Sequence, residues 1–220
     1  MIERLPARAI RTITYRTIGI GESAAEQMLE DLVKIPNPNV ATYAKDDGVQ
    51  IRVTGVAPTI VEADALRDGA AQEVERRLAA FIYGTDDTSL ASALLGLLRD
   101  RGLSLGIADR GGGGRLASLL LSEPSAVDLL RPSTVGPTCD ISTGELARDA
   151  VWQSGASLGV GISVQARPSD PVYEGTIAVS IAGAAQVDES FPIRSSFEEI
   201  QRRSGLTAAD VLRRALLRIG

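Results

Sequence analysis

The groups best placed to do chemistry in this 220-residue chain form one run: Asp109, Arg110, Gly111, Gly112, Gly113, Gly114 and Arg115. Consecutive glycines let the backbone approach a ligand closely, and the start of a following helix offers free N–H groups to an anion. The two arginines that bracket the glycines could bind a phosphate. The alternative explanation for the glycines is a flexible turn without a ligand. The alternative explanation for the arginines is ordinary surface charge. The run fits neither the GxGxxG pattern of dinucleotide sites nor the GxxxxGK[ST] phosphate loop, so both of those assignments fail.

Several common catalytic groups are missing from the chain. It has no histidine and a single cysteine, Cys139. These absences remove the usual general base near neutral pH, every Ser-His or Cys-His couple, an intrachain disulfide and any CxxC metal site. The only lysines, Lys34 and Lys45, lie in the first third. Carboxylates, hydroxyls, tyrosines, arginines, one thiol and backbone N–H groups therefore remain for chemistry.

Three lesser candidates have simpler explanations. Cys139 has no histidine to activate it, so we expect a partly buried structural thiol. The pairs Asp46-Asp47 and Asp86-Asp87 could hold Mg²⁺, but both fall in predicted turns, where Asp is common for backbone reasons. We therefore expect no metal site and no cofactor.

The composition is that of a folded protein. Hydrophobic residues make up 44% of the chain, the net charge is -5 and the pI is about 4.9. An acidic surface argues against nucleic acid as a partner, because phosphate binding needs concentrated positive charge. No apolar run approaches the roughly 20 residues that span a bilayer, and the first residues lack the apolar segment of a signal peptide. We expect a cytoplasmic protein that does not bind membranes.

Residues 1–84 predict a small α+β domain with helices layered on a sheet. Alternating apolar residues and turn signals give its elements. These are a strand over 11–18, a helix opened by a capping box of Ser23 and Glu26, a hairpin of strands 40–44 and 49–56, and a helix over 60–81.

Residues 85–220 predict a three-layer α/β/α domain. A helix over 89–101, a strand over 103–108 and a helix over 115–121 surround the glycine run as the first half of a βα unit. Residues 130–139 predict a loop, and Ser142 with Glu145 predicts a capped helix to about residue 154. The remaining elements are strands over 158–164 and 176–181 separated by a loop over 165–175, a strand over 186–193, and two helices capped by Ser195 and Thr207.

The first domain resembles the KH-like middle domain of the CinA family of competence/damage-inducible proteins. Two stretches carry the resemblance in order and spacing: Gly19-Ile20-Gly21-Glu22-Ser23 after a TxxT strand, and NPNVATYAK over 37–45. Gly19-Ile20-Gly21 is not the GxxG loop that holds nucleic acid in KH domains. The resemblance continues more loosely through the second domain, up to Gly175-Thr176.

The resemblance implies the fold of a nicotinamide mononucleotide deamidase for the second domain. Members of the family carry AESCTGG at this turn and use its serine as nucleophile. Here that serine position is Arg110, and of ESCTGG only the two glycines remain, as Gly113 and Gly114. A guanidinium is always protonated and cannot attack an amide carbonyl. The family's YSNxxK stretch and GIAGP loop are also replaced, by residues 125–137 and 161–168.

We therefore predict a CinA-like pseudoenzyme with no catalytic residue. Its second domain would serve as a structural, dimerising or ligand-sensing module, in which Asp109 to Arg115 bind a phosphate-bearing nucleotide, and we expect a homodimer. The alternative is an active amidohydrolase with a re-sited nucleophile at Ser104, Ser118 or Ser163, for which the sequence supplies no visible base. A third interpretation is a partner for a separate protein that carries the family's N-terminal domain, similar to molybdopterin-binding proteins.

Overall fold

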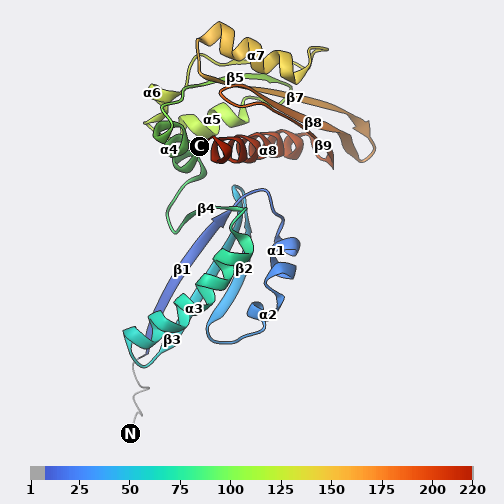
Figure 1. Cartoon of the computed structure of the whole chain (residues 1–220). Helices are drawn as coiled ribbons and strands as arrows, with labels where there is room; N and C mark the ends of the chain where they lie inside the picture. Colours follow the sequence, from blue (N-terminus) through green and yellow to red (C-terminus); the bar gives the residue numbers. More distant parts are fainter. Residues whose placement is uncertain (1–7, 220) are drawn as a thin grey trace. The chain divides into compact units, whose positions relative to one another are not determined.

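The computed structural model describes residues 8–219 and divides the chain into two compact units, the first ending at Ser89 and the second starting at Leu90. The first unit holds a four-stranded antiparallel sheet in the order β2-β3-β1-β4 (Figure 1). Its strands are β1 (Ala9–Thr17), β2 (Asn39–Lys45), β3 (Gly48–Ala57) and β4 (Ile82–Thr85). The hairpin of β2 and β3 confirms the prediction, whereas β4, which begins directly after the predicted helix over 60–81, was not among the predicted strands.

Three helices pack on this sheet around one apolar core. They are α1 (Glu22–Met28), α2 (Glu30–Val33) and α3 (Ile60–Leu78). Buried side chains of the strands and helices, among them Tyr15 and Val74, form the core. The predicted capping box of Ser23 and Glu26 is wrong. Gly21 stands at the start of α1 without a side-chain cap, and the Glu26 carboxylate instead accepts a hydrogen bond from the Thr42 hydroxyl. The α+β prediction for this domain is confirmed.

The second unit holds a five-stranded mixed sheet in the order β6-β5-β7-β8-β9. Strands β6, β5 and β7 run parallel, and β8 and β9 continue the sheet antiparallel. The strands are β5 (Leu105–Arg110), β6 (Thr134–Gly136), β7 (Leu158–Ser169), β8 (Val172–Gly183) and β9 (Val187–Ser195). The three-residue strand β6 lies within the stretch that we predicted as a loop.

Helices cover both faces of this sheet, which confirms the three-layer prediction (Figure 1). On one face lies α7 (Thr143–Ser154), which begins at the predicted capping box of Ser142 and Glu145. On the other lie α4 (Leu90–Asp100), α5 (Arg115–Leu121) and α8 (Phe197–Arg218), with α6 (Ala126–Leu129) against α4. Gly159 and Gly161 of β7 let α7 approach, because a Cβ there would meet backbone oxygens of α7 at 2.1 Å. Within the described residues, no helix has the length and apolar composition needed to cross a membrane.

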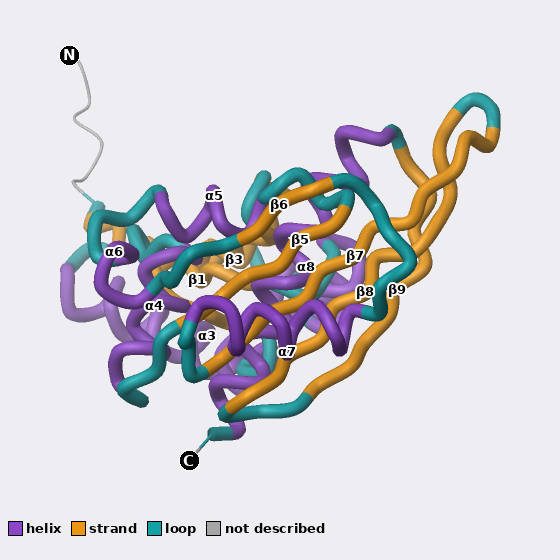
Figure 2. The backbone as a smooth tube through the Cα atoms, turned by 90° about the horizontal axis from the view of Figure 1, so that it is seen from above, coloured by secondary structure: helices purple, strands orange, loops and turns teal. Residues whose placement is uncertain are grey.

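Two predicted breaks do not occur. The stretch 165–175 is no loop, since β7 and β8 continue their pairing there and turn only at Asp170-Pro171. The resulting hairpin extends beyond the rest of the sheet (Figure 2). The last two predicted helices are one, α8, which Ser196 caps. Gly205 inside α8 is explained by packing rather than by a helix end, because a Cβ there would lie 2.6 Å from the Cβ of Arg115 on α5.

Candidate functional site

The glycine turn lies at the carboxyl ends of the parallel strands β5 and β6, beside the middle of β7. The chain leaves β5 for α5 on one face of the sheet, whereas it leaves β6 for α7 on the other face. Connections that diverge in this way leave a crevice at the carboxyl end of an α/β sheet, where ligands commonly bind. The fold therefore places Asp109 to Arg115 at a favourable position.

The Asp109 carboxylate binds the glycine turn that follows it. Its side chain is 1% exposed, and its two oxygens accept hydrogen bonds from the N–H groups of Gly112 at 2.7 Å and Gly114 at 2.8 Å. The N–H of Gly111 donates to the carbonyl of Gly136 at 2.9 Å. Burial raises the pKa of Asp109, although the two N–H groups act in the opposite direction. Three of the four glycine N–H groups are thus bonded within the chain.

The glycines are required by the shape of this turn. Gly111, Gly113 and Gly114 have φ values of +85°, +72° and +70°, which side chains other than glycine rarely adopt. At Gly112 the restriction is space, because a Cβ there would lie 2.6 Å from one Asp109 oxygen and 2.9 Å from the Ser204 hydroxyl oxygen. The turn therefore closes around its own carboxylate, with α8 packed against it.

The two arginines that bracket the glycines line different pockets. Arg110 donates from Nη1 to the Asp109 carbonyl at 3.0 Å and to Thr134 Oγ1 at 3.4 Å, and it faces a cleft between α7 and β6. Arg115 lines a pocket of about 200 Å³ together with Glu198, Glu199 and Arg202 at the start of α8. The chain thus directs the two guanidinium groups into separate pockets.

The cleft beside Arg110 has a volume of about 190 Å³. Its floor is apolar, formed by the buried residues Ala108, Leu146 and Ala150. Asp149 and Gln153 of α7 and Thr134 of β6 add polar groups to its walls. The remaining lining residues are Ile107, Pro132 and Ile141.

Sequence reasoning missed Asp149 and Gln153 as site residues. One signal could have found them. Both stand three residues after an apolar core position, Leu146 or Ala150, on the helix that Ser142 caps. Residues three apart lie on neighbouring positions of a helix surface, so both side chains border the buried stripe of α7.

The three serines considered as re-sited nucleophiles have different surroundings. Ser104 is bonded to Ser157, whose hydroxyl accepts from the Ser104 N–H at 2.7 Å. Ser118 is exposed on α5. Ser163 lies on β7 beside Arg110 of β5, is 5% exposed, and its hydroxyl has no hydrogen-bond partner among the described residues. Ser163 is therefore the one candidate of the three that combines burial, an unpaired hydroxyl and a place beside the turn.

The remaining sequence candidates do not converge on a site. Cys139 is a free, partly buried thiol. Asp47 accepts a hydrogen bond from the Tyr83 hydroxyl, and Asp86 accepts one from the Thr14 N–H. Across residues 8–219, no group of three or more His, Cys, Asp or Glu side chains is arranged to hold a metal ion.

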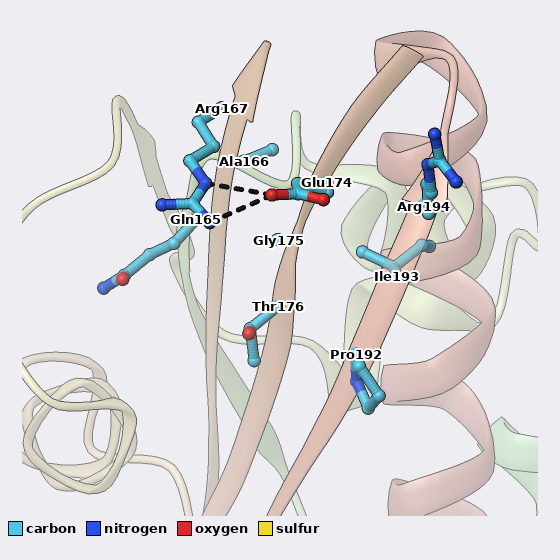
Figure 3. A pocket seen from close by; sticks show the side chains of 9 residues that line it. All are labelled: Gln165, Ala166, Arg167, Glu174, Gly175, Thr176, Pro192, Ile193 and Arg194. Atoms are coloured by element: carbon cyan, nitrogen blue, oxygen red, sulfur yellow. Dashed lines mark hydrogen bonds and ion pairs between the residues drawn. The ribbon is translucent and has the colours of Figure 1, made fainter. Parts of the chain in front are cut away.

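A larger groove lies on the hairpin of β7 and β8 and on the neighbouring part of β9 (Figure 3). Its volume is about 770 Å³ and it contains none of the predicted site residues. Arg167 and Glu174 form an ion pair across it at 2.9 Å, with side chains 80% and 40% exposed. Because these charges already neutralise each other in contact with solvent, we place the candidate site at the cleft instead.

Comparisons with known proteins match both parts of the chain. The family model described as damage-inducible protein CinA KH domain matches residues 12–84. A CinA-like protein of Thermomicrobium roseum is 41% identical over 95% of this chain and 54% of its own length. A CinA-like protein of Deinococcus deserti is 32% identical over 97% of this chain and 56% of its own length. The chain thus spans about half the length of these relatives.

Solved structures give a weaker likeness. A competence-damaged protein (CinA) superfamily protein from Klebsiella pneumoniae is 18% identical, with a TM-score of 0.49 over 58% of this chain and 96% of its own.

Proposed function

This chain belongs to the CinA family, its first domain is the CinA KH domain, and we propose that its second domain binds a small anionic ligand without hydrolysing it. The observation that carries the proposal is Arg110. It stands where the resemblance places the nucleophile, and it faces the cleft between α7 and β6. A guanidinium is always protonated, so it can bind an oxyanion but cannot act as nucleophile or base.

The Asp109 geometry changes which groups would bind the ligand. Because the N–H groups of Gly112 and Gly114 already donate to Asp109, they are not free for a phosphate. The anionic group of a phosphate-bearing nucleotide would instead meet Arg110, with Thr134 beside it. In this proposal Asp109 and the four glycines are positioning residues, since they fix the backbone from which Arg110 projects.

A proton NMR time course of nicotinamide mononucleotide with the purified protein tests the proposal. We expect broadened ligand lines and no deamidated product. Arg110→Ala should weaken binding roughly 10-fold to 100-fold, as expected when a hydrogen bond to a charged group is lost. Arg99→Ala changes an arginine on α4, on the opposite face of the sheet, and should leave binding unchanged. Steady formation of product, or equal binding by both variants, would refute the proposal.

One observation favours a second candidate, an active amidohydrolase that uses Ser163. Its hydroxyl is buried and unpaired beside Arg110. Against it stands the missing base, because a serine hydroxyl needs a proton acceptor to become a nucleophile. Product formation that Ser163→Ala abolishes and Arg110→Ala leaves intact would establish this candidate.

The cellular setting belongs to the same proposal. We propose a cytoplasmic homodimer, or a partner for a separate protein with the family's N-terminal domain. Light scattering on the purified protein distinguishes a dimer from a monomer, and co-purification tests for the partner.

A further inference from the structure

We infer that the ligand of the cleft between α7 and β6 is zwitterionic, with an oxyanion bound by Arg110 and an ammonium bound by Asp149. This inference rests on the proposed function, because it names the chemistry of the ligand at that same site. It starts from two opposite charges in one small cavity. Arg110 and Asp149 both line the cleft of about 190 Å³.

The two charges do not neutralise each other. Among the described residues, Arg110 bonds to the Asp109 carbonyl and to Thr134, and no ion pair joins it to Asp149. Asp149 is exposed on α7, and its carboxylate has no hydrogen bond or ion pair to any described residue. A guanidinium and a carboxylate that share a cavity without contact can both bind one ligand that carries the opposite charge at each end. A simple anion would be attracted by the Arg110 guanidinium but repelled by the Asp149 carboxylate.

The space between the charges limits the size of the ligand. The floor of Ala108, Leu146 and Ala150 offers no hydrogen-bonding side chain. The part of the ligand between its two charged ends, which would lie on this floor, must therefore be apolar or flat. The volume of about 190 Å³ is below the roughly 300 Å³ at which pockets for drug-sized ligands begin. A small zwitterion, or the end of a larger ligand, would therefore fill it. The Gln153 amide on the same wall can both donate and accept.

Probes that differ only in charge test the inference. Phosphoethanolamine carries a phosphate and an ammonium, β-alanine a carboxylate and an ammonium, and inorganic phosphate an anion alone. Each is titrated into ¹⁵N-labelled protein at constant ionic strength while the amide signals of Ala108, Arg110 and Asp149 are followed. We expect at least one zwitterion to bind roughly tenfold more tightly than inorganic phosphate, the factor that about 1.4 kcal/mol represents. Which zwitterion binds better identifies the oxyanion as phosphate or carboxylate.

Two variants and a control assign the ends of the ligand. Asp149→Asn should weaken the zwitterion roughly tenfold and leave inorganic phosphate unchanged or tighter, whereas Arg110→Ala should weaken every probe. Asp128→Asn removes an exposed carboxylate outside the cleft and should change nothing. Amide spectra of each variant show whether it is folded, and Arg110→Lys serves as a second variant that keeps the charge.

The outcomes separate this inference from the proposed function. The zwitterion inference is wrong if inorganic phosphate binds as tightly as the zwitterions and Asp149→Asn has no effect on binding. If Arg110→Ala still weakens binding in that case, the proposed anion site stands. If Arg110→Ala leaves all binding intact, the proposed function fails as well. Absence of binding by every probe overturns the inference.

Discussion

The turn after β5 and the cleft between α7 and β6 lie at the same end of one sheet, yet their polar groups have opposite surroundings. In the turn, the Asp109 carboxylate and two glycine N–H groups bind one another at 2.7 and 2.8 Å. In the cleft, Arg110 and Asp149 carry opposite charges and do not bind each other. The glycine pattern in the sequence indicates where backbone donors gather, but only the fold shows whether an internal acceptor already occupies them.

The largest effect that tests this comparison should come from Asp109→Ala. We expect the free energy of unfolding to fall by about 3 kcal/mol, because two hydrogen bonds to a charged acceptor are lost and a buried N–H group is left unpaired. Urea unfolding followed by circular dichroism measures the change. Asp128→Ala removes an exposed carboxylate and should stay within about 0.5 kcal/mol of the unaltered protein. Equal effects of the two variants would show that Asp109 does not hold the turn together.

The pH dependence of Asp109 sharpens the same test. Burial raises its pKa above the ordinary value of 3.8. A carboxyl group whose folded pKa is raised contributes stability at low pH and loses that contribution as the pH rises through the folded pKa. The free energy of unfolding of the unaltered protein, relative to Asp109→Asn, should therefore fall as the pH rises from below 3.8. A rise instead would show that the two N–H bonds outweigh burial.

A matched pair of glycines should give the next largest effect. Gly112→Ala places a Cβ 2.6 Å from an Asp109 oxygen, and we expect it to cost roughly 2 to 3 kcal/mol, as overpacking does. Gly113→Ala meets only the flexible Gln201 side chain, at 3.1 Å, and should cost about 1 kcal/mol for its left-handed backbone. Urea unfolding of both variants compares them. Equal costs would mean that the turn does not close around the carboxylate.

The local patterns of the sequence predicted much of this fold. Alternating apolar residues predicted the hairpin of β2 and β3, and the capping box of Ser142 and Glu145 predicted the start of α7. The errors came from residues whose roles depend on distant neighbours. Thr207 predicted the start of a second helix, but α8 continues through it, and the missing side chain of Gly205 within α8 makes room for α5. Residues 165–175 were predicted as a loop, but pairing between β7 and β8 continues through that stretch.

The candidate site was only partly predictable for the same reason. Sequence reasoning placed Asp109 to Arg115 after a strand and before a helix, and the fold has them there. It could not show that Arg110 and Arg115 face separate pockets, because that depends on which elements cover each face of the sheet. The helical spacing places Asp149 beside the buried stripe of α7, but only the packing of α7 on β5 brings it into the same cleft as Arg110.

The smallest effect should come from the groove on the hairpin of β7 and β8. Arg167 and Glu174 pair there at 2.9 Å with largely solvent-exposed side chains, and exposed pairs contribute only about 0 to 1 kcal/mol because water and salt screen them. Arg167→Ala should therefore leave the free energy of unfolding nearly unchanged and should not alter ligand binding in the cleft. Urea unfolding and the nicotinamide mononucleotide titration measure both, with Glu174→Gln as the matched variant. If Arg167→Ala abolishes nucleotide binding while the free energy of unfolding stays unchanged, the ligand binds in this groove and not in the cleft. The ion pair would then contact the ligand and would not be needed for stability.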